Sequence, residues 1–214
     1  MTAAPLTVAE ELLLLAHDPA RGRPLANARY LRWGPAGAAL AELAEAGRIA
    51  GERGNRITVV NPLPPGDPVP DGAPAALPVP AKQRRGVAAE RWVQRSGRPV
   101  QELCLRRLVE RGALRREPRR APGLFRYERF PAGAVDLLGP ARERFVAAAA
   151  AGFPDRRGRL LGALVSAAGL DRTVLPGRDH RTARRAMKHF AQEIWTAQAV
   201  GRAVRADKSA ADGS

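Results

Sequence analysis

A short apolar segment near the N-terminus sets the first constraint on the fold. Thr7 and Glu10 have the spacing of a capping box, in which each side chain accepts a hydrogen bond from the backbone amide of the other residue. The residues from Leu12 to Leu15 are apolar on every side of a helix. The helix predicted from Thr7 to about Ala16 should therefore be deeply buried. With 214 residues, the chain is long enough to form a core around it.

The composition favours helices over strands elsewhere as well. Apolar residues make up 45% of the chain, but aromatic residues only 5%, so the core should consist of Leu, Ala and Val. Leu and Ala favour helix. Further helices are predicted at 36–46, 86–94, 99–111, 139–150, 155–168 and 181–205, and two short strands at 48–50 and 57–60.

Three segments are predicted to differ from this helical pattern. Residues 61–80 hold eight of the nineteen prolines, which indicates a loop. Residues 113–130 have the pattern of a β-hairpin, with a turn at 118–123. The tail, 206–214, is expected to be disordered. We therefore expect one domain over residues 1–205.

Positive charge is concentrated in one part of the chain. Residues 82–129 contain fifteen Lys or Arg and five Asp or Glu, a net charge of +10 within a chain total of +15. Only three of the 36 basic residues are lysines, so a general bias towards Arg explains part of the charge but not its clustering. A basic face on a folded element is typical of proteins that bind a polyanion, either lipid headgroups or nucleic acid.

Several functional classes are not supported by the sequence. The single cysteine, Cys104, rules out an internal disulfide, favours a cytoplasmic location and is expected to be a small buried residue. No apolar run approaches the ~18 residues of a membrane span, so a membrane contact would be peripheral. There is no P-loop or G-x-G-x-x-G motif, and the pair His189 and Glu193 falls far short of a metal site. We expect no enzyme activity, no cofactor and no metal.

The hairpin and one tryptophan are candidates for a binding surface. Trp33, which lies two residues before Pro35, is the better candidate for a surface aromatic, whereas Trp92 and Trp195 are expected in the core. Near the hairpin turn, Leu124 and Phe125 could insert into a membrane or a partner, although packing on the domain is an equal alternative. The surrounding arginines would face anionic lipid well; they are Arg115, Arg116, Arg119 and Arg120.

Two other interpretations of the basic charge remain open. Residues 40–49 and 105–114 each combine a helix, a glycine cap and a candidate hairpin, which is the outline of a winged-helix DNA-binding protein. However, the helix predicted at 99–111 carries Leu and Cys on one side and mixed charge on the other, unlike a face that reads bases, so nucleic acid is the less favoured partner. The third interpretation is a basic scaffold that binds an acidic protein.

Five segments in register resemble the Golgi phosphoprotein 3 family, in a bacterial-type version. They are 6–15 (LTVAEELLLL), 41–49 (AELAEAGRI), 66–68 (GDP), 108–114 (LVERGAL) and 123–125 (GLF), with weaker similarity at 160–170 and 192–204. The resemblance implies a mainly helical domain with a buried helical core, surrounding amphipathic helices and a protruding β-hairpin. It also implies peripheral binding to membranes that contain phosphatidylinositol 4-phosphate, on the inner face of the membrane. The hairpin would contact the membrane or other copies of the protein, and the family also implies recruitment of a protein partner.

The family's headgroup pocket carries over to this sequence in part. Its tryptophan falls at Asn27 and one arginine at Ala36, while two arginines one turn apart fall at Arg98 and Gln101. Of these four positions, Arg98 alone keeps the family residue. The loop before the second predicted helix could rebuild the site; the candidates there are Arg29, Arg32 and Trp33.

Overall fold

The computed structural model describes residues 5–25, 27–52, 55–61, 87–120 and 126–212, with only the backbone at Ala28, Arg29, Glu52, Arg126 and Asp212. The predicted proline-rich loop therefore lies, from residue 62 onward, outside the described residues. Leu124, Phe125 and part of the hairpin turn lie outside them too.

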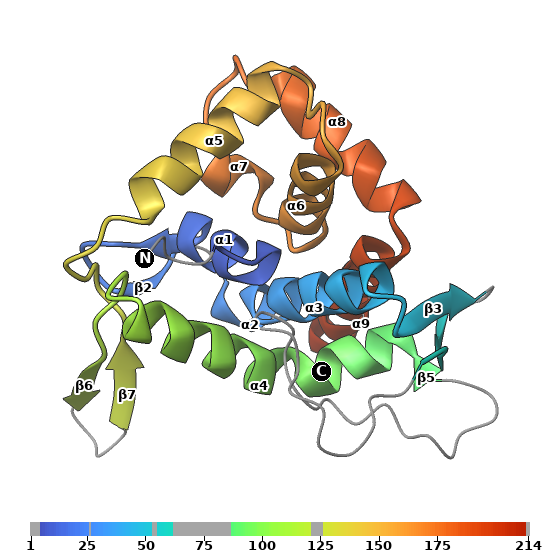
Figure 1. Cartoon of the computed structure of the whole chain (residues 1–214), viewed down its shortest axis with the longest axis horizontal. Helices are drawn as coiled ribbons and strands as arrows, with labels where there is room; N and C mark the ends of the chain where they lie inside the picture. Colours follow the sequence, from blue (N-terminus) through green and yellow to red (C-terminus); the bar gives the residue numbers. More distant parts are fainter. Residues whose placement is uncertain (1–4, 26, 53–54, 62–86, 121–125, 213–214) are drawn as a thin grey trace.

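The chain is mainly helical, as the sequence predicted (Figure 1). The helices are α1 Val8–Leu15, α2 Ala28–Leu31, α3 Trp33–Glu45, α4 Ala89–Glu110, α5 Leu138–Ala150, α6 Arg156–Ala167, α7 Asp171–Val174, α8 Arg181–Glu193 and α9 Trp195–Asp212.

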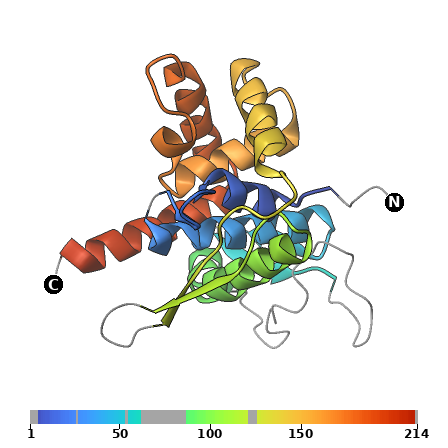
Figure 2. The same cartoon turned by 90° about the vertical axis from the view of Figure 1, so that its left-hand side faces the viewer.

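The strands form three small antiparallel sheets. β1 (His17–Asp18) pairs with β2 (Arg23–Pro24), and β3 (Ile49–Glu52), β4 (Arg56–Val59) and β5 (Val87–Ala88) form a sheet in that order. β6 (Glu117–Arg120) and β7 (Arg126–Arg129) form a hairpin in which Arg119 lies opposite Tyr127. A hairpin is present within residues 113–130, as predicted, but residues 118–120 belong to strand β6 and not to the turn expected at 118–123. The hairpin projects from the helical body (Figure 2).

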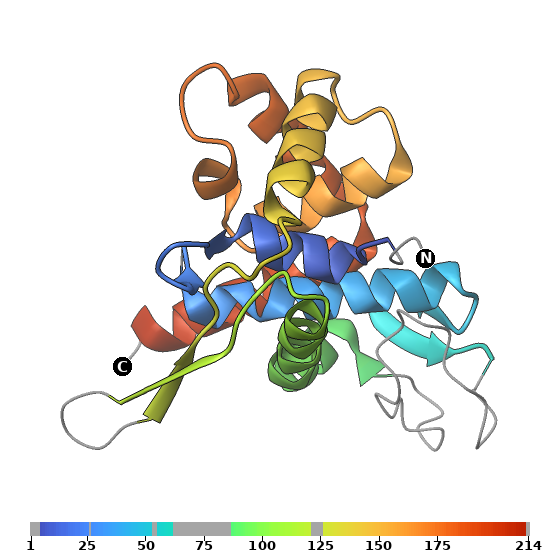
Figure 3. The ribbon, with the colours of Figure 1, turned by 60° about the vertical axis from the view of Figure 1, so that its left-hand side comes forward.

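Helix α1 lies at the centre of the molecule. All eight of its residues are buried, and the predicted capping box is present, with the Glu10 amide donating to Thr7 Oγ1 (3.2 Å) and the Thr7 amide donating to Glu10 Oε2 (2.9 Å). Figure 3 shows α1 between a layer formed by α3, α4 and α9 and a second group of helices, α5 to α8. Helix α1 contacts α3, α4, α5 and α6.

Buried carboxylates join α1 to helix α4. Glu10 is fully buried, and its carboxylate lies 3.2 Å from Arg107 Nε and 3.4 Å from Arg111 Nη1. Both arginines are largely covered. The pairing compensates the Glu10 carboxylate for the water that it loses on burial.

A second buried carboxylate joins α1 to α5 and α6. Glu11 is 4% exposed. Its oxygens lie 2.8 Å from Arg157 Nη2 of α6 and 3.4 Å from Arg144 Nη2 of α5, and the same Arg157 nitrogen donates to the carbonyl of Leu6. Because Glu10 and Glu11 are adjacent, α1 binds arginines from both groups of helices.

Helix α4 corrects the prediction of two helices separated near Pro99. It is one helix of 22 residues with Pro99 inside it. A proline at an interior position costs about 3 kcal/mol in a helix. The cost is offset by burial, because Trp92, Val93, Val100 and Leu108 are all buried at helical spacing on both sides of Pro99. This continuous apolar face packs on α3 and α9.

The end of the chain corrects two further predictions. The helix expected at 181–205 is divided at Ile194, whose backbone is extended (φ −80°, ψ 112°). The expected disordered tail is wrong as far as Asp212, because α9 continues through Ala206 to that residue. Buried Val204 anchors this part of α9, and Lys208 Nζ lies 5.4 Å from the ring centroid of Tyr30.

The base of the hairpin is attached to the loop between β1 and β2. The amide of Phe130 donates to the carbonyl of Gly22 (2.8 Å), and the amide of Ala132 donates to the carbonyl of Pro19 (2.9 Å). Gly22 has a φ of +63°, and a Cβ at that position would lie 2.5 Å from the nitrogen of Pro131. Glycine is therefore required where the hairpin meets the body.

The ion pairs of Glu11 predict that loss of this buried carboxylate lowers stability more than loss of an exposed one. Glu11→Gln should lower the free energy of unfolding by on the order of 1–3 kcal/mol, because Arg144 and Arg157 lose their carboxylate. Glu102→Gln is the matched control, since its pair with Arg98 is exposed and should contribute little. Urea unfolding at pH 7 measures both, and equal effects of the two substitutions would contradict this role of Glu11.

Glu42 predicts a pH dependence of stability. Burial is the main cause that raises the pKa of Glu42 to about 7, against the opposing hydrogen bond from the Val8 amide (3.2 Å). Because this pKa is above its unfolded value of 4.5, stability is present below pH 4.5 and is lost as the pH rises towards 7. Glu42→Gln keeps an acceptor for Val8 and removes the titration.

The advantage of Glu42→Gln over wild type should therefore increase by roughly 2 kcal/mol between pH 5 and pH 8. Urea unfolding of both proteins at the two pH values measures this difference. The neighbouring titrations, including that of His17, whose pKa is lowered to about 4 by burial, are common to both proteins and cancel. A constant difference would mean that Glu42 does not titrate in this range.

Candidate functional site

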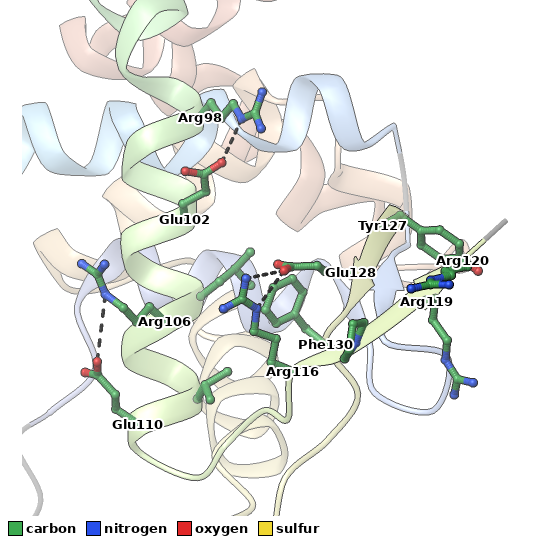
Figure 4. A pocket seen from close by; sticks show the side chains of 13 residues that line it. Arg98, Glu102, Arg106, Glu110, Arg116, Arg119, Arg120, Tyr127, Glu128 and Phe130 are labelled. Carbon is green, nitrogen blue, oxygen red and sulfur yellow. Dashed lines mark hydrogen bonds and ion pairs between the residues drawn. The ribbon is translucent and has the colours of Figure 1, made fainter. Parts of the chain in front are cut away.

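A groove of about 1210 Å³ lies between helix α4 and the β6–β7 hairpin (Figure 4). One wall is the outer face of α4, and the other is formed by the two hairpin strands and the residues beside them. The apolar side chains that line it include Leu105 and Val109 from α4 and Phe130 from the hairpin. The groove therefore combines an apolar surface with charged walls.

Charged residues recur every four positions along the α4 wall. Arg98, Glu102, Arg106 and Glu110 lie on one stripe of the helix because side chains four residues apart share a face. Arg98 Nε donates to Glu102 Oε1 (2.8 Å), and Arg106 Nε lies 4.0 Å from Glu110 Oε1. The hydrogen bond with Glu102 also raises the pKa of Arg98, which stays charged. Each arginine is exposed yet oriented by a carboxylate one turn away.

The hairpin wall also contains pairs of arginine and glutamate. Arg116 pairs with Glu128 across the hairpin, and Arg119 Nη2 lies 2.8 Å from Glu117 Oε2. Arg120 is exposed and pairs with no acidic residue in the described part of the chain. The ring of Tyr127 also lines the groove and is 41% exposed.

The charges of the groove leave a modest excess of positive charge. Among the described residues that line it, five are arginines and three are glutamates, which leaves two positive charges. A dianionic group in the groove would accept from several guanidinium forks, and the glutamates would have to release them. A group with two negative charges would balance this excess.

The structure brings some of the predicted site residues together. Arg98 of α4 lines the groove with Arg116, Arg119 and Arg120 of the hairpin. Arg115 does not line it, because its Nε donates to the carbonyl of Ala132 (3.0 Å) at the base of the hairpin. Leu124 and Phe125 are outside the described residues, so their proposed insertion stays a prediction.

The structure corrects the prediction that Trp33 is a surface aromatic of the site. Trp33 is 2% exposed and therefore is a core residue, not a surface aromatic. It is covered because Tyr30 stacks on it (ring centroids 5.8 Å apart) and Arg32 lies 5.4 Å from its ring centroid. The core positions of Cys104 and Trp92 are confirmed, whereas Trp195 is half-buried.

The remaining predicted residues lie beside the groove but do not line it. Gly97, next to Arg98, packs against the ring of Trp33 and the carbonyl of Arg32 at the start of α3. Gln101 is half-buried on α4. Arg29 belongs to α2, and its side chain is not described. The segment before α3, which was expected to be a loop, contains α2 and is close to the Arg98 end of α4. Arg32 and Trp33 do not line the groove.

The sequence analysis missed the middle of the α4 wall and the ring on the hairpin. Arg106 extends the stripe that Arg98 begins, and Tyr127 lies across the strands from Arg119. The repeat of charged residues every four positions was a visible signal. The repeat was not recognised, because a break near Pro99 was expected to place Arg98 outside the helix that carries Arg106.

Other kinds of site find little support in the described part of the chain. No group of three metal-ligating side chains occurs among those residues. No helix described there is long and apolar enough to cross a bilayer. Burial raises the pKa of the Cys104 thiol to about 12, which leaves it protonated and unreactive at neutral pH.

Comparison with known proteins agrees with the fold and with the family features in the sequence. The chain matches the family model described as Golgi phosphoprotein 3 (GPP34) over residues 8–206. A search of curated protein sequences found no significant match. The family match extends from the first residue of α1 into the last turns of α9 and so includes both walls of the groove. The chain therefore belongs to the Golgi phosphoprotein 3 (GPP34) family.

Proposed function

We propose that this protein binds anionic lipid headgroups at a membrane surface through the groove between α4 and the hairpin. The observation that carries the proposal is the convergence of Arg98 from α4 with Arg116, Arg119 and Arg120 from the hairpin on one groove. The protein would act as a peripheral membrane-binding protein on the cytoplasmic face of a membrane, and not as an enzyme.

The chemistry of the groove favours a phosphorylated headgroup. Guanidinium groups bond phosphate oxygens in pairs, and a phosphomonoester carries about −1.5 to −2 charges at pH 7. Such a group can compete with Glu102 and Glu128 for their arginines, whereas a phosphodiester with one charge competes less well. By resemblance to the family, the ligand proposed is phosphatidylinositol 4-phosphate, which carries both kinds of phosphate.

The hairpin would bring the groove to the bilayer. It projects from the helical body (Figure 2), and exposed Tyr127 has the amphipathic ring that is enriched at membrane interfaces. Arg119 and Arg120 of β6 are exposed and would add attraction to anionic lipid. Contact between the hairpins of two copies on the same membrane is a further role that the family resemblance suggests.

DNA binding is supported less well by the same groove. Glu102 and Glu110 place a carboxylate at every second turn of the α4 wall, and these carboxylates would repel a line of DNA phosphates. The buried face of α4 is apolar and packs on α3 and α9. The buried face of α4 cannot reach bases, and its exposed face alternates arginine with glutamate, unlike the base-reading face of a recognition helix.

The first test compares vesicle binding by wild type and Arg98→Ala/Arg116→Ala. Co-sedimentation at 0.15 M salt would use neutral vesicles, anionic vesicles without phosphoinositide, and vesicles with phosphatidylinositol 4-phosphate at the same total charge. The double variant should bind phosphoinositide vesicles roughly tenfold more weakly, because two charge-assisted contacts are lost. Arg142→Ala/Arg205→Ala is the control with the same loss of charge, since both arginines are exposed and neither lines the groove.

Equal binding of wild type to both anionic vesicles would reduce the proposal to a charged surface without a headgroup site. Failure to bind any vesicle, with retention of a short DNA duplex at the same salt, would favour the nucleic-acid alternative. Equal losses in the double variant and in Arg142→Ala/Arg205→Ala, which removes the same charge, would show that total charge, and not the groove, governs binding.

Removal of a glutamate from the groove should strengthen vesicle binding, in contrast to removal of the arginines. Glu102→Gln frees Arg98 and should strengthen binding to all anionic vesicles, with the larger gain for lipids that carry a single charge. The preference for phosphatidylinositol 4-phosphate over generic anionic lipid should therefore decrease. The same assay measures the ratio, and an unchanged or larger preference would show that Glu102 does not compete with the lipid.

A further inference from the structure

The outer face of helix α8 carries a row of cations. Arg181, Arg185 and Lys188 are exposed and lie at i, i+4 and i+7, which places them on one side of the helix. Met187 is buried and Phe190 half-buried on the opposite side, where α8 packs against α6 and α9. We call Arg181, Arg185 and Lys188 the α8 stripe.

Some arginines near the α8 stripe have partners within the protein, unlike the members of the stripe. Arg184, on the same helix, donates to the carbonyls of Leu175 and Gly177 (both 2.7 Å). Other arginines, such as Arg157, pair with glutamates. No acidic residue in the described ranges forms an ion pair with a member of the stripe, and the pair on α8 itself is His189 with Glu193 (3.2 Å).

The stripe destabilises its own helix in the free protein. Like charges three or four residues apart repel on a helix, and Arg181, Arg184, Arg185 and Lys188 form four such pairs. There is no acidic residue in the first turn, where negative charge would be favourable. In α4, by contrast, acidic residues alternate with basic ones. An unrelieved repulsion of this kind is explained if a partner supplies the missing negative charges.

We propose that the α8 stripe is the docking site for an acidic helical segment of a partner protein. The stripe spans about 10 Å along the helix axis, at a rise of about 1.5 Å per residue. Carboxylates at i, i+4 and i+7 of a partner helix repeat with the same spacing, so two such helices packed side by side can pair all three cations. The proposal does not depend on the lipid-binding function.

A short protein helix fits the stripe better than a nucleic acid does. The positive row is bounded by acidic residues, because Asp179 precedes it and Glu193 lies beyond it. No aromatic side chain is among its members for a base to stack on. DNA-binding proteins typically contact 6–10 phosphates, which is more than the three cations of the stripe provide.

The position of α8 would let both partners bind at once. Figures 1 and 2 show α8 at the end of the molecule opposite the β6–β7 hairpin. A protein held to a membrane by its hairpin would keep α8 away from the lipid. The stripe would then recruit an acidic partner to the membrane surface.

The test uses two synthetic helical peptides of identical composition. In one, glutamates occupy i, i+4 and i+7 on one face; in the other, they are spread around the helix. Fluorescence anisotropy at 0.15 M salt, without membranes, would measure their affinity for the full chain. The aligned peptide should bind at least about tenfold more tightly, because one face then meets all three cations.

Charge reversal identifies the surface. Arg181→Glu/Arg185→Glu/Lys188→Glu should abolish the preference for the aligned peptide. The control is Arg95→Glu/Arg142→Glu/Arg205→Glu, which changes the net charge equally at exposed residues elsewhere and should retain it. The stripe variant should also have a higher midpoint of thermal unfolding than wild type, because two of the four repulsive pairs become attractive pairs with Arg184 and a carboxylate at position 181 is favourable in the first turn of α8. If that variant does not fold, Arg185→Gln/Lys188→Gln tests the same contact.

Three results would overturn the proposal. Equal affinity for the two peptides would mean that only total charge matters. Equal loss of the preference for the aligned peptide in both triple variants would show that the peptide does not bind at α8. Tighter binding of a 20-base-pair duplex at the same salt, lost in the stripe variant, would make the surface a nucleic-acid site. Because no membrane is present, none of these results bears on the lipid-binding proposal.

Discussion

Two adjacent buried carboxylates on α1 hold the two groups of helices together. Glu10 binds Arg107 and Arg111 of α4, and Glu11 binds arginines of α5 and α6. Burial of a charge is tolerated only when partners replace the lost water, so α1 cannot take its central place without these helices. The position of α4, and with it one wall of the groove, therefore depends on an ion pair on the inner side of the helix.

This arrangement changes the meaning of the clustered positive charge. Arg107 and Arg111 belong to the basic stretch of 82–129, but they neutralise Glu10 and contribute to the fold. Arg98, Arg106 and Arg116 face the groove, each beside a glutamate. The charge available to a ligand is thus much smaller than the net +10 of the sequence. A groove of this kind selects its ligand by the number and geometry of charges, while the general attraction to anionic surfaces comes from the arginines outside these pairs.

The parts of the structure that depend on neighbouring residues were predictable from the sequence, and those that depend on distant contacts were not. The capping box of Thr7 and Glu10 is local, and its prediction is confirmed. Pro99 is a reliable local signal for a break, but the apolar face of α4 on α3 and α9 overrides it. Trp33 was placed at the surface because its neighbours in sequence are polar or small; its burial follows from Tyr30 and from α4. Arg98 was identified through the family, whereas its neighbours in the groove required the folded hairpin.

The two basic surfaces of the molecule solve opposite electrostatic problems. On α4, alternation of Arg and Glu stabilises the free helix, and a ligand must displace carboxylates to bind; selectivity is gained at the expense of affinity. On α8, the cations repel one another, and correctly spaced carboxylates of a partner would remove this repulsion. The affinity for the partner is then gained at the expense of the stability of the free helix. If both proposals hold, the protein would be selective towards its lipid at one end and would accept an acidic segment of matching spacing at the other. The contrast follows from the glutamates, which alternate with arginines on the α4 wall and are absent from the α8 stripe.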